Sequence, residues 1–243
     1  MSERVPERWR TLLLAVAIAL AGIIAAVGLT LLAALAFAAA GVHPTVTASV
    51  VLTIVLTEGL AFAGVALTYV SLRIGDWSFV KIRVPTLRDL GWIVGGYLLV
   101  LVLVFVAAFG VQLLGGSPAP NQLSEVGLQN PSLLPLLVPL SLLLVGPGEE
   151  LLFRGVVQGT LRRSFAPASA VVLSSAIFAG VHFLALTGGT GARLTTIAIL
   201  FIPSLVFGAA YELTENLTVP ILVHGLYDAT LAVFLFIGLH GVG

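Results

Sequence analysis

The chain contains no cysteine, and few of its residues carry a charge. The absence of cysteine excludes disulfides, thiolate metal sites and a cysteine nucleophile. Charged residues make up 9 % of the chain, whereas soluble domains carry roughly 25 %, so a water-soluble globule is excluded. The eleven basic and eleven acidic residues give a net charge of zero, which argues against nucleic acid as a partner.

Long apolar segments dominate what is present. Hydrophobic residues form 59 % of the 243 residues, and the mean hydropathy is +1.14. The segment Thr11–Ala40 contains no charge, although about 20 apolar residues already cross a bilayer. This first segment is also too long for a cleavable signal peptide. The sequence therefore predicts an integral membrane protein with a single domain, residues 1–243.

Hydropathy predicts an all-α, polytopic bundle of about seven transmembrane helices, with six or eight as the alternatives. No internal repeat is visible. The motifs described below fall in the second half, about 132–240. The predicted spans are 11–40, 47–72, 90–114, 132–161, 167–186, 194–212 and 219–240.

The distribution of basic residues predicts the orientation. Nine basic residues lie on one side of the predicted spans and Arg193 alone on the other. Cytoplasmic connections are enriched in Lys and Arg, so the side with nine is expected to face the cytoplasm. We therefore expect a multi-pass protein of the cell membrane with its N-terminus in the cytoplasm. The nine residues are Arg4, Arg8, Arg10, Arg73, Lys81, Arg83, Arg88, Arg162 and Arg163.

Ionisable residues inside the predicted spans are the strongest functional signal, since such groups are costly in hydrocarbon. Most of them fall in three clusters, at 146–154, 178–182 and 224–228. Glu58 in the second span is isolated, and it either supports the site or makes a structural hydrogen bond.

The first cluster combines two adjacent carboxylates with an arginine. Glu150 and Arg154 are four residues apart and so share a helix face, which predicts an ion pair. Glu149 then has no local partner, which suits it to general base and acid work. The alternative is a structural charge network. Pro147, between two glycines, is expected to kink or break the helix just before the carboxylates.

The other two clusters have the same four-residue spacing. Phe178 and His182 share one helix face, and His224 and Asp228 share a face of another, where the carboxylate can orient the imidazole. At 1.5 Å per residue, His224 lies about 8 Å from the predicted cytoplasmic end of its span. By the same count, Glu149 and His182 lie about 20 Å from the cytoplasmic ends of theirs. This mismatch requires a tilted last span, a buried turn near 213–218, or a wrong boundary.

Three short motifs therefore follow one another: Glu-Glu-x-x-x-Arg at 149–154, Phe-x-x-x-His at 178–182 and His-x-x-x-Asp at 224–228. In this order they resemble the CPBP family of CAAX prenyl endopeptidases, abortive-infection proteins and bacteriocin-processing or immunity proteins. The resemblance implies that Glu149 activates the attacking water with help from His182. It also implies that Glu150 and Arg154 hold the site together, while His224 and the residue at 228 stabilise the oxyanion.

Position 228 departs from the prenyl endopeptidases, which carry asparagine there. An ionised aspartate cannot donate a hydrogen bond to an oxyanion. Asp228 must therefore be protonated, orient His224, or bind a cation.

The sequence thus predicts an intramembrane endopeptidase without a cofactor. Its expected partners are the lipid bilayer and a membrane-associated polypeptide, for which the resemblance implies a lipid-modified C-terminus. Zinc is the alternative to a glutamate-only mechanism, with Glu149, His182 and His224 as ligands. The rival functions are a proton- or ion-coupled transporter and a non-catalytic immunity or scaffold protein.

Overall fold

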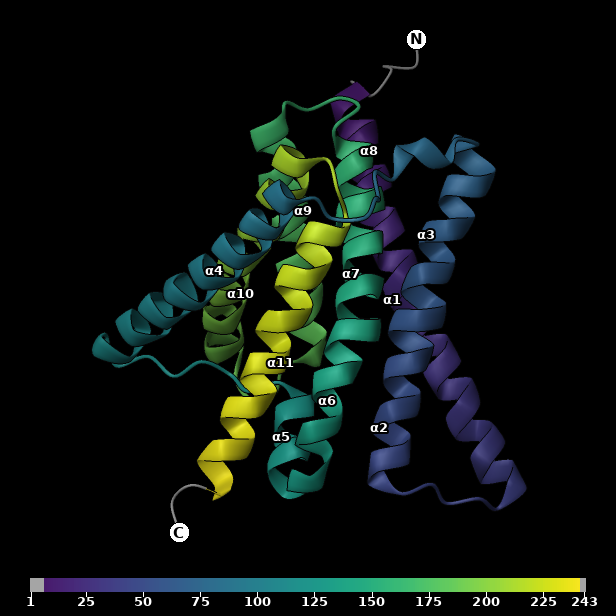
Figure 1. Cartoon of the computed structure of the whole chain (residues 1–243). Helices are drawn as coiled ribbons and strands as arrows, with labels where there is room; N and C mark the ends of the chain where they lie inside the picture. Colours follow the sequence, from purple (N-terminus) through teal and green to yellow (C-terminus); the bar gives the residue numbers. More distant parts are fainter. Residues whose placement is uncertain (1–6, 241–243) are drawn as a thin grey trace.

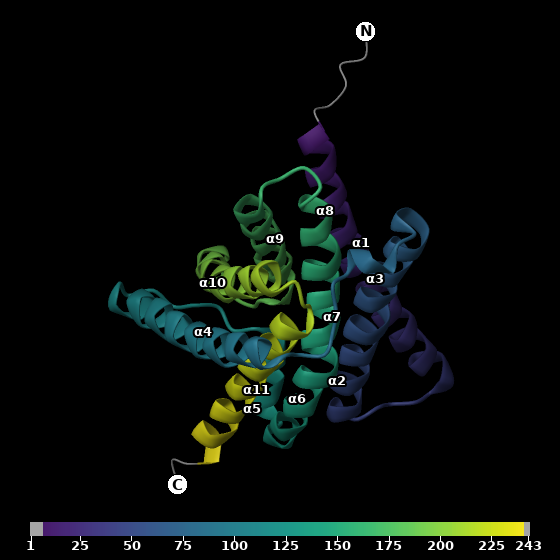
Figure 2. The same ribbon diagram turned by 45° about the horizontal axis from the view of Figure 1, so that its top comes forward.

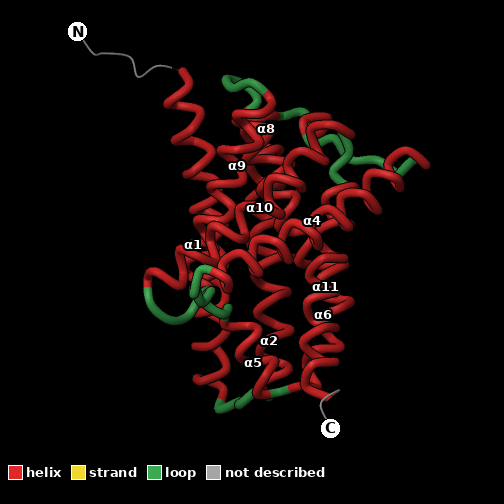
Figure 3. The backbone as a smooth tube through the Cα atoms, turned by 90° about the vertical axis from the view of Figure 1, so that its left-hand side faces the viewer, coloured by secondary structure: helices red, strands yellow, loops and turns green. Residues whose placement is uncertain are grey.

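The computed structural model describes residues 7–240, and this range forms a bundle of helices without a β-strand (Figures 1 and 3). Seven of its helices are long and apolar enough to cross a membrane. Each end of these helices lies within four residues of the end predicted from the sequence. The prediction of an all-α bundle with seven spans is therefore confirmed, and the chain is a multi-pass membrane protein.

The first span is α1 (Glu7–Ala40). The second is a continuous helix made of α2 (Val46–Ile54), η1 (Val55–Phe62), α3 (Ala63–Tyr69) and η2 (Val70–Ile74). The third is α4 (Leu87–Leu113). The fourth span consists of η4 (Pro131–Leu133), α6 (Leu134–Leu140), η5 (Ser141–Val145), α7 (Gly146–Glu150), η6 (Leu151–Gln158) and α8 (Gly159–Leu161). The last three are α9 (Pro167–Val181) with η7 (His182–Ala185), α10 (Thr190–Thr214) and α11 (Thr218–His240). Two connections contain the short helices η3 (Trp77–Phe79) and α5 (Gln122–Gln129).

The fourth span runs through the middle of the bundle, with the other helices around it (Figures 1 and 2). On one side α1 packs against η1 and η6, and on the other α11 packs against α6, η5 and α7. Helix α10 packs against both α9 and α4. The start of α1 and the end of α11 lie at opposite ends of the bundle (Figure 1), as an odd number of spans requires.

The segments that carry the predicted cytoplasmic charges gather at one end of the bundle. The start of α1, the connection from η2 to α4 and the turn from α8 to α9 lie at the upper end in Figure 1. Together with the adjoining ends of η2 and α4, which carry Arg73 and Arg88, they contain eight of the nine basic residues, and Arg4 lies outside the described residues. The choice of the cytoplasm for this end stays a prediction.

The turn between α10 and α11 is buried in protein, which resolves the mismatch in depth. Asn216 and Leu217 are both fully buried. The extended segment before α4 covers them: Leu217 N donates to Lys81 O at 2.7 Å, and Arg83 N donates to Asn216 Oδ1 at 3.0 Å. A short, buried turn therefore starts α11 below the end of the bundle, so that His224 reaches the depth of the first two clusters.

The helix is not broken at Pro147, which excludes one of the two outcomes expected from the sequence, a kink or a break. The five residues before Gly146 form the π-helical segment η5, and the helix then continues through α7 into the second π-helical segment, η6. Proline lacks an N–H and its ring crowds the preceding turn, and a wider π turn accommodates both effects without interrupting the helix.

The two glycines beside Pro147 instead allow neighbouring backbones to come close. A Cβ atom on Gly146 would lie 2.8 Å from the carbonyl oxygen of Ile221 on α11. A Cβ atom on Gly148 would lie 2.6 Å from the carbonyl oxygen of Glu58 on η1. Both distances are shorter than real Cβ contacts, so α7 is held between η1 and α11 with no side chain in between. This packing brings residues of three spans to the carboxylates of α7.

Candidate active site

Glu149 lies at the centre of a buried polar cluster that joins three spans. One carboxylate oxygen, Oε1, is 3.6 Å from His182 Nε2 at the start of η7, and the other, Oε2, is 3.6 Å from His224 Nε2 on α11. Both separations are too long for a direct hydrogen bond. Glu149 therefore has one histidine at each oxygen and no tight ion pair that would use up its basicity.

The orientation of His182 is fixed by its own helix. Its Nδ1 is 2.7 Å from the carbonyl oxygen of Phe178, one turn earlier. Because a carbonyl oxygen only accepts hydrogen bonds, Nδ1 carries the hydrogen. Nε2, the atom that faces Glu149, is thereby left to take up or release a proton. The Phe178 ring packs against the imidazole, with ring centres 4.5 Å apart.

His224 is held by carboxylates at both ring nitrogens. Its Nδ1 donates a hydrogen bond of 2.7 Å to Glu150 Oε1, and its Nε2 lies 3.3 Å from Asp228 Oδ2. Its ring stacks on Phe207 of α10 at a centroid distance of 4.6 Å. Carboxylates at both nitrogens match the two N–H groups of an imidazolium, which can donate a charge-assisted hydrogen bond.

Arg154 neutralises the second carboxylate from within the same helix. Its Nη1 lies 3.0 Å from Glu150 Oε1, and both side chains are fully buried. Nη2 donates to the hydroxyl and the carbonyl oxygen of Ser204 at 2.8 and 3.1 Å. The guanidinium also sits 4.5 Å from the centre of the Phe178 ring, a cation–π contact. Glu150 is thus tied to Arg154 on one side and to His224 on the other.

The structure brings all seven residues singled out from the sequence into this one cluster: Glu149, Glu150, Arg154, Phe178, His182, His224 and Asp228. Sequence reasoning missed Ser204 and Phe207 on α10, since neither belongs to a spaced pair of ionisable residues. It left Glu58 undecided, and Glu58 packs directly on Gly148.

Two other acidic residues, Glu212 and Glu215, lie outside the cluster. Glu212 pairs with Arg162, and the exposed Glu215 pairs with Lys81. The hydrogen bond from Lys81 holds the pKa of the Glu215 carboxyl below its usual range. These pairs stabilise the end of the bundle rather than the cluster.

The side chains proposed for zinc do not fit a metal site. Within residues 7–240, no three His, Asp or Glu side chains are grouped so that they would hold one metal ion. The Nε2 atoms of His182 and His224 each lie 3.6 Å from a different oxygen of Glu149. The mechanism derived below therefore uses protein groups alone.

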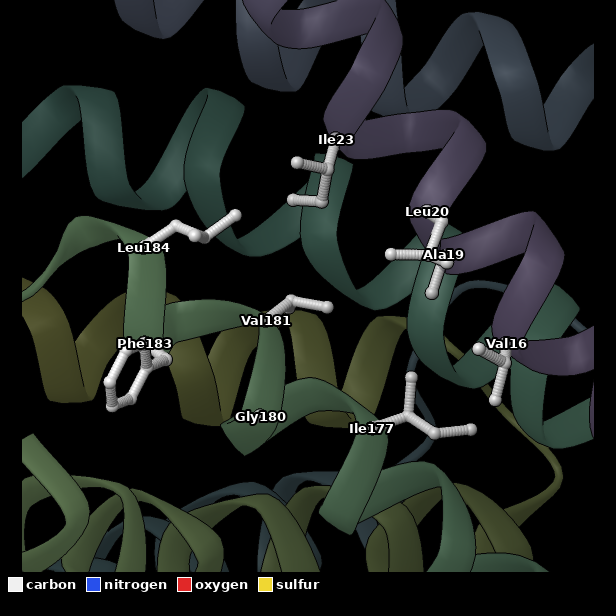
Figure 4. Close-up of a pocket in the computed structure, with 9 residues that line it drawn as sticks. All are labelled: Val16, Ala19, Leu20, Ile23, Ile177, Gly180, Val181, Phe183 and Leu184. Carbon is white, nitrogen blue, oxygen red and sulfur yellow. The ribbon is translucent and has the colours of Figure 1, made fainter.

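An apolar hollow of about 410 Å³ lies between α1 on one side and the end of α9 with the start of η7 on the other (Figure 4). Its walls include Val181 and Phe183, the two sequence neighbours of His182, and Leu20 and Ile23 of α1. None of the nine residues lining the hollow is charged. The hollow is therefore suited to apolar groups rather than to water.

The fold and the cluster define a class: a polytopic membrane protein with an acid–base site buried between its later helices. Residues 131–230 match the family model of Rce1-like type II CAAX prenyl endopeptidases, a family of membrane proteases, and this confirms the resemblance seen in the motifs. The match covers less than half of the chain and includes the seven clustered residues, but not Glu58. Comparisons with curated proteins and with solved structures give no match.

Proposed function

We propose that this protein is an intramembrane endopeptidase in which Glu149 activates water for attack on a peptide carbonyl. The observation that carries the proposal is the position of Glu149, which is buried and has a histidine Nε2 at 3.6 Å from each carboxylate oxygen. Peptide hydrolysis needs a base for water, a donor for the oxyanion and an acid for the leaving amine. Glutamate and two histidines can supply all three.

In the proposed reaction, a water molecule lies between Glu149 and His182 and loses a proton to Glu149 as its oxygen bonds to the peptide carbonyl carbon. The carbonyl oxygen becomes an oxyanion and accepts a hydrogen bond from Nε2–H of His224. The tetrahedral intermediate then collapses and the C–N bond breaks. The proton held by Glu149 or His182 moves to the leaving nitrogen. The products are a carboxylic acid and an amine, and the protein groups return to their starting protonation states.

Asp228 fits the role of orienting His224. Of the three roles open to it, this one agrees with its 3.3 Å separation from His224 Nε2. A carboxylate at this position favours the protonated ring, and the protonated ring is the form that donates to the oxyanion. Asn at this position would hold the ring without that charge.

The substrate proposed is a membrane-associated polypeptide with a lipid-modified C-terminus. Two observations support it: the match to a prenyl endopeptidase family and the uncharged hollow between α1 and the end of α9 (Figure 4). We further propose that the protein lies in the cell membrane with the start of α1 on the cytoplasmic side, in keeping with the positive-inside rule.

The proposal is tested by comparing the wild-type protein with Glu149→Gln and Glu150→Gln. Purified protein in lipid nanodiscs is incubated with peptides that carry or lack a C-terminal isoprenoid, and membrane proteomics follows released C-terminal peptides in cells. Glu149→Gln should abolish cleavage and keep the fold. Glu150→Gln should instead lower the stability, because stranding one partner of a buried ion pair costs about 3–5 kcal/mol.

Glu125→Gln is the matched control, since this acidic residue hydrogen-bonds to Thr187 outside the cluster. It should cleave like the wild type. Wild-type turnover by Glu149→Gln would remove the proposed base. In that case, complementation in cells by the same variant would favour a non-catalytic role, and proton uptake by liposomes without substrate would favour a transporter.

A further inference from the structure

Glu58 is a buried acidic side chain for which the proposed reaction has no use. It lies on η1, in the part of the chain outside the family match, and it is 8 % exposed. Its Oε2 atom is buried and has no hydrogen-bond partner. A buried polar atom without a partner is destabilising by about 1–3 kcal/mol, so Glu58 needs an explanation.

The position of Glu58 joins it to the cluster around Glu149. Its carbonyl oxygen lies where a Cβ atom on Gly148 would be, 2.6 Å away, so its backbone touches the residue just before Glu149. Helix α7, which carries Glu149, packs against η1 at this point. The other elements packed against η1, namely α1, α2, α3 and η5, bring no ionisable side chain to this point.

The cluster contains more acidic groups than basic ones. Glu58, Glu149, Glu150 and Asp228 are the four carboxyl groups, and Arg154, His182 and His224 are the three groups that can be cationic. Neighbouring carboxylates in a low dielectric cannot all be ionised. One carboxyl group is therefore left without a compensating positive charge, even when both histidines are protonated.

The contacts single out this carboxyl group. Glu150 has Arg154 at 3.0 Å and His224 at 2.7 Å. Asp228 has His224 at 3.3 Å, and Glu149 has both histidines at 3.6 Å. No cationic group lies within ion-pair distance of Glu58 among the described residues.

We propose that Glu58 is a positioning residue of this site: it remains a neutral carboxylic acid whose O–H is directed toward Glu149, so that the negative charge stays on Glu149. The proposal rests on the proposed function for its consequence in catalysis. By keeping the extra proton, Glu58 prevents Glu149 from taking it up and losing its basicity. Its neutral O–H also provides a hydrogen-bond donor, which an ionised carboxylate lacks.

Infrared spectroscopy tests the protonation state without any substrate. The protein has only eleven acidic residues, so the C=O stretching band of a protonated carboxylic acid can be assigned by single substitutions. At neutral pH the wild-type protein in nanodiscs should show this band, and Glu58→Gln and Glu58→Met should both lack it. Asp228→Asn should keep it. No band in the wild type, or a band lost in Asp228→Asn and kept in Glu58→Gln, overturns the proposal.

The turnover number then tests the consequence for catalysis. Glu58→Met removes the donor and should lower kcat about tenfold, the loss expected for one hydrogen bond. Glu58→Gln keeps a neutral donor of the same shape and should recover most of that loss. Gly59→Ala is the control: its Cβ would meet only Leu144, at an ordinary 3.7 Å, and kcat should stay at the wild-type value.

Equal losses in Glu58→Gln and Glu58→Met would mean that the site needs an ionised Glu58, and would contradict the proposal. Wild-type kcat in Glu58→Met would contradict it as well. If the wild-type protein cleaves no peptide, the proposed function fails, while the infrared band still decides whether Glu58 carries the proton. The two failures are therefore distinguishable.

Discussion

His224 is the residue whose surroundings most directly determine the chemistry available to the site. Glu150 accepts from its Nδ1, Asp228 faces its Nε2, and Phe207 covers one face of its ring. The ring is therefore fixed in rotation as well as in charge. Such preorganised donors account for a large part of the stabilisation of oxyanions in enzymes.

Substitutions at His224 and Asp228 should differ in severity. His224→Ala removes the proposed oxyanion donor and should lower turnover about 100- to 1,000-fold. Asp228→Asn should be milder, because it keeps the shape and adds a possible donor. It should also narrow the pH profile at its alkaline end, since the protonated ring then no longer faces a negative charge at Nε2.

The measurement is the pH dependence of turnover for the wild type, His224→Ala and Asp228→Asn, each with and without a chelator. Glu150 remains at Nδ1 in Asp228→Asn, so the change at the alkaline end should be modest. An inactive Asp228→Asn enzyme, together with a wild type that a chelator inhibits and zinc restores, would contradict the metal-free mechanism.

Local spacing explains why so many site residues could be predicted from the sequence. Glu150 with Arg154, Phe178 with His182 and His224 with Asp228 are all four residues apart, and that spacing puts two side chains on one helix face whatever the tertiary structure. The contacts between helices were beyond this reasoning. The hydrogen bond from His224 to Glu150 joins residues 74 positions apart, and no pattern within either helix indicates it.

At the scale of helices, the close approach of η1, α7 and α11 is the feature that assembles the site. The sequence-based interpretation took Gly146, Pro147 and Gly148 as a kink or a break in the helix. Their effect in the fold is instead to remove side chains from two helix–helix contacts. A sequence pattern reports a loss of helix propensity, but it does not report which backbone will pack against the glycine.

Gly148→Ala should therefore destabilise the protein, although alanine is the better helix former. The new Cβ would lie 2.6 Å from Glu58 O, and overpacking of this kind typically costs about 1–3 kcal/mol. The midpoint of thermal unfolding in detergent measures the effect. Turnover should fall too, because separating η1 from α7 moves Glu58 away from Glu149.

Gly64→Ala provides the control, on α3 in the continuous helix that also carries Glu58. Nothing lies within 4 Å of its Cβ position, so removal of a helical glycine should raise the stability by about 0.5–1 kcal/mol. If both variants unfold at the wild-type temperature, the glycine contacts do not limit the packing of the site.

For the molecule as a whole, hydropathy was sufficient to predict the seven spans, because a bilayer sets the length of an apolar helix. It was not sufficient to predict how deep each residue lies. Asn216 and Leu217 form a turn that is fully buried, and its burial depends on the distant segment around Lys81 and Arg83. A hydropathy profile treats each span by itself and contains no information about such a cover.

The orientation can be tested by introducing cysteines, with no native cysteine to give a background. Ser78 lies in the connection before α4 and Ser117 in the connection after it, and both are exposed. A membrane-impermeant thiol reagent should label the two positions from opposite sides, with Ser78 on the cytoplasmic side. Labelling of both positions from the same side would contradict the assignment of α4 as a span.

The start of α1 and the end of α11 lie at opposite ends of the bundle (Figure 1), which has a consequence for how this protein can be rearranged. Many soluble domains tolerate new termini because their natural ends are close and can be joined by a short peptide. Here a joining peptide would have to pass through hydrocarbon, where an irregular backbone cannot satisfy its polar groups. A circular permutant is therefore possible only with an additional transmembrane helix, and the order of the seven helices along the chain is fixed by the bilayer itself.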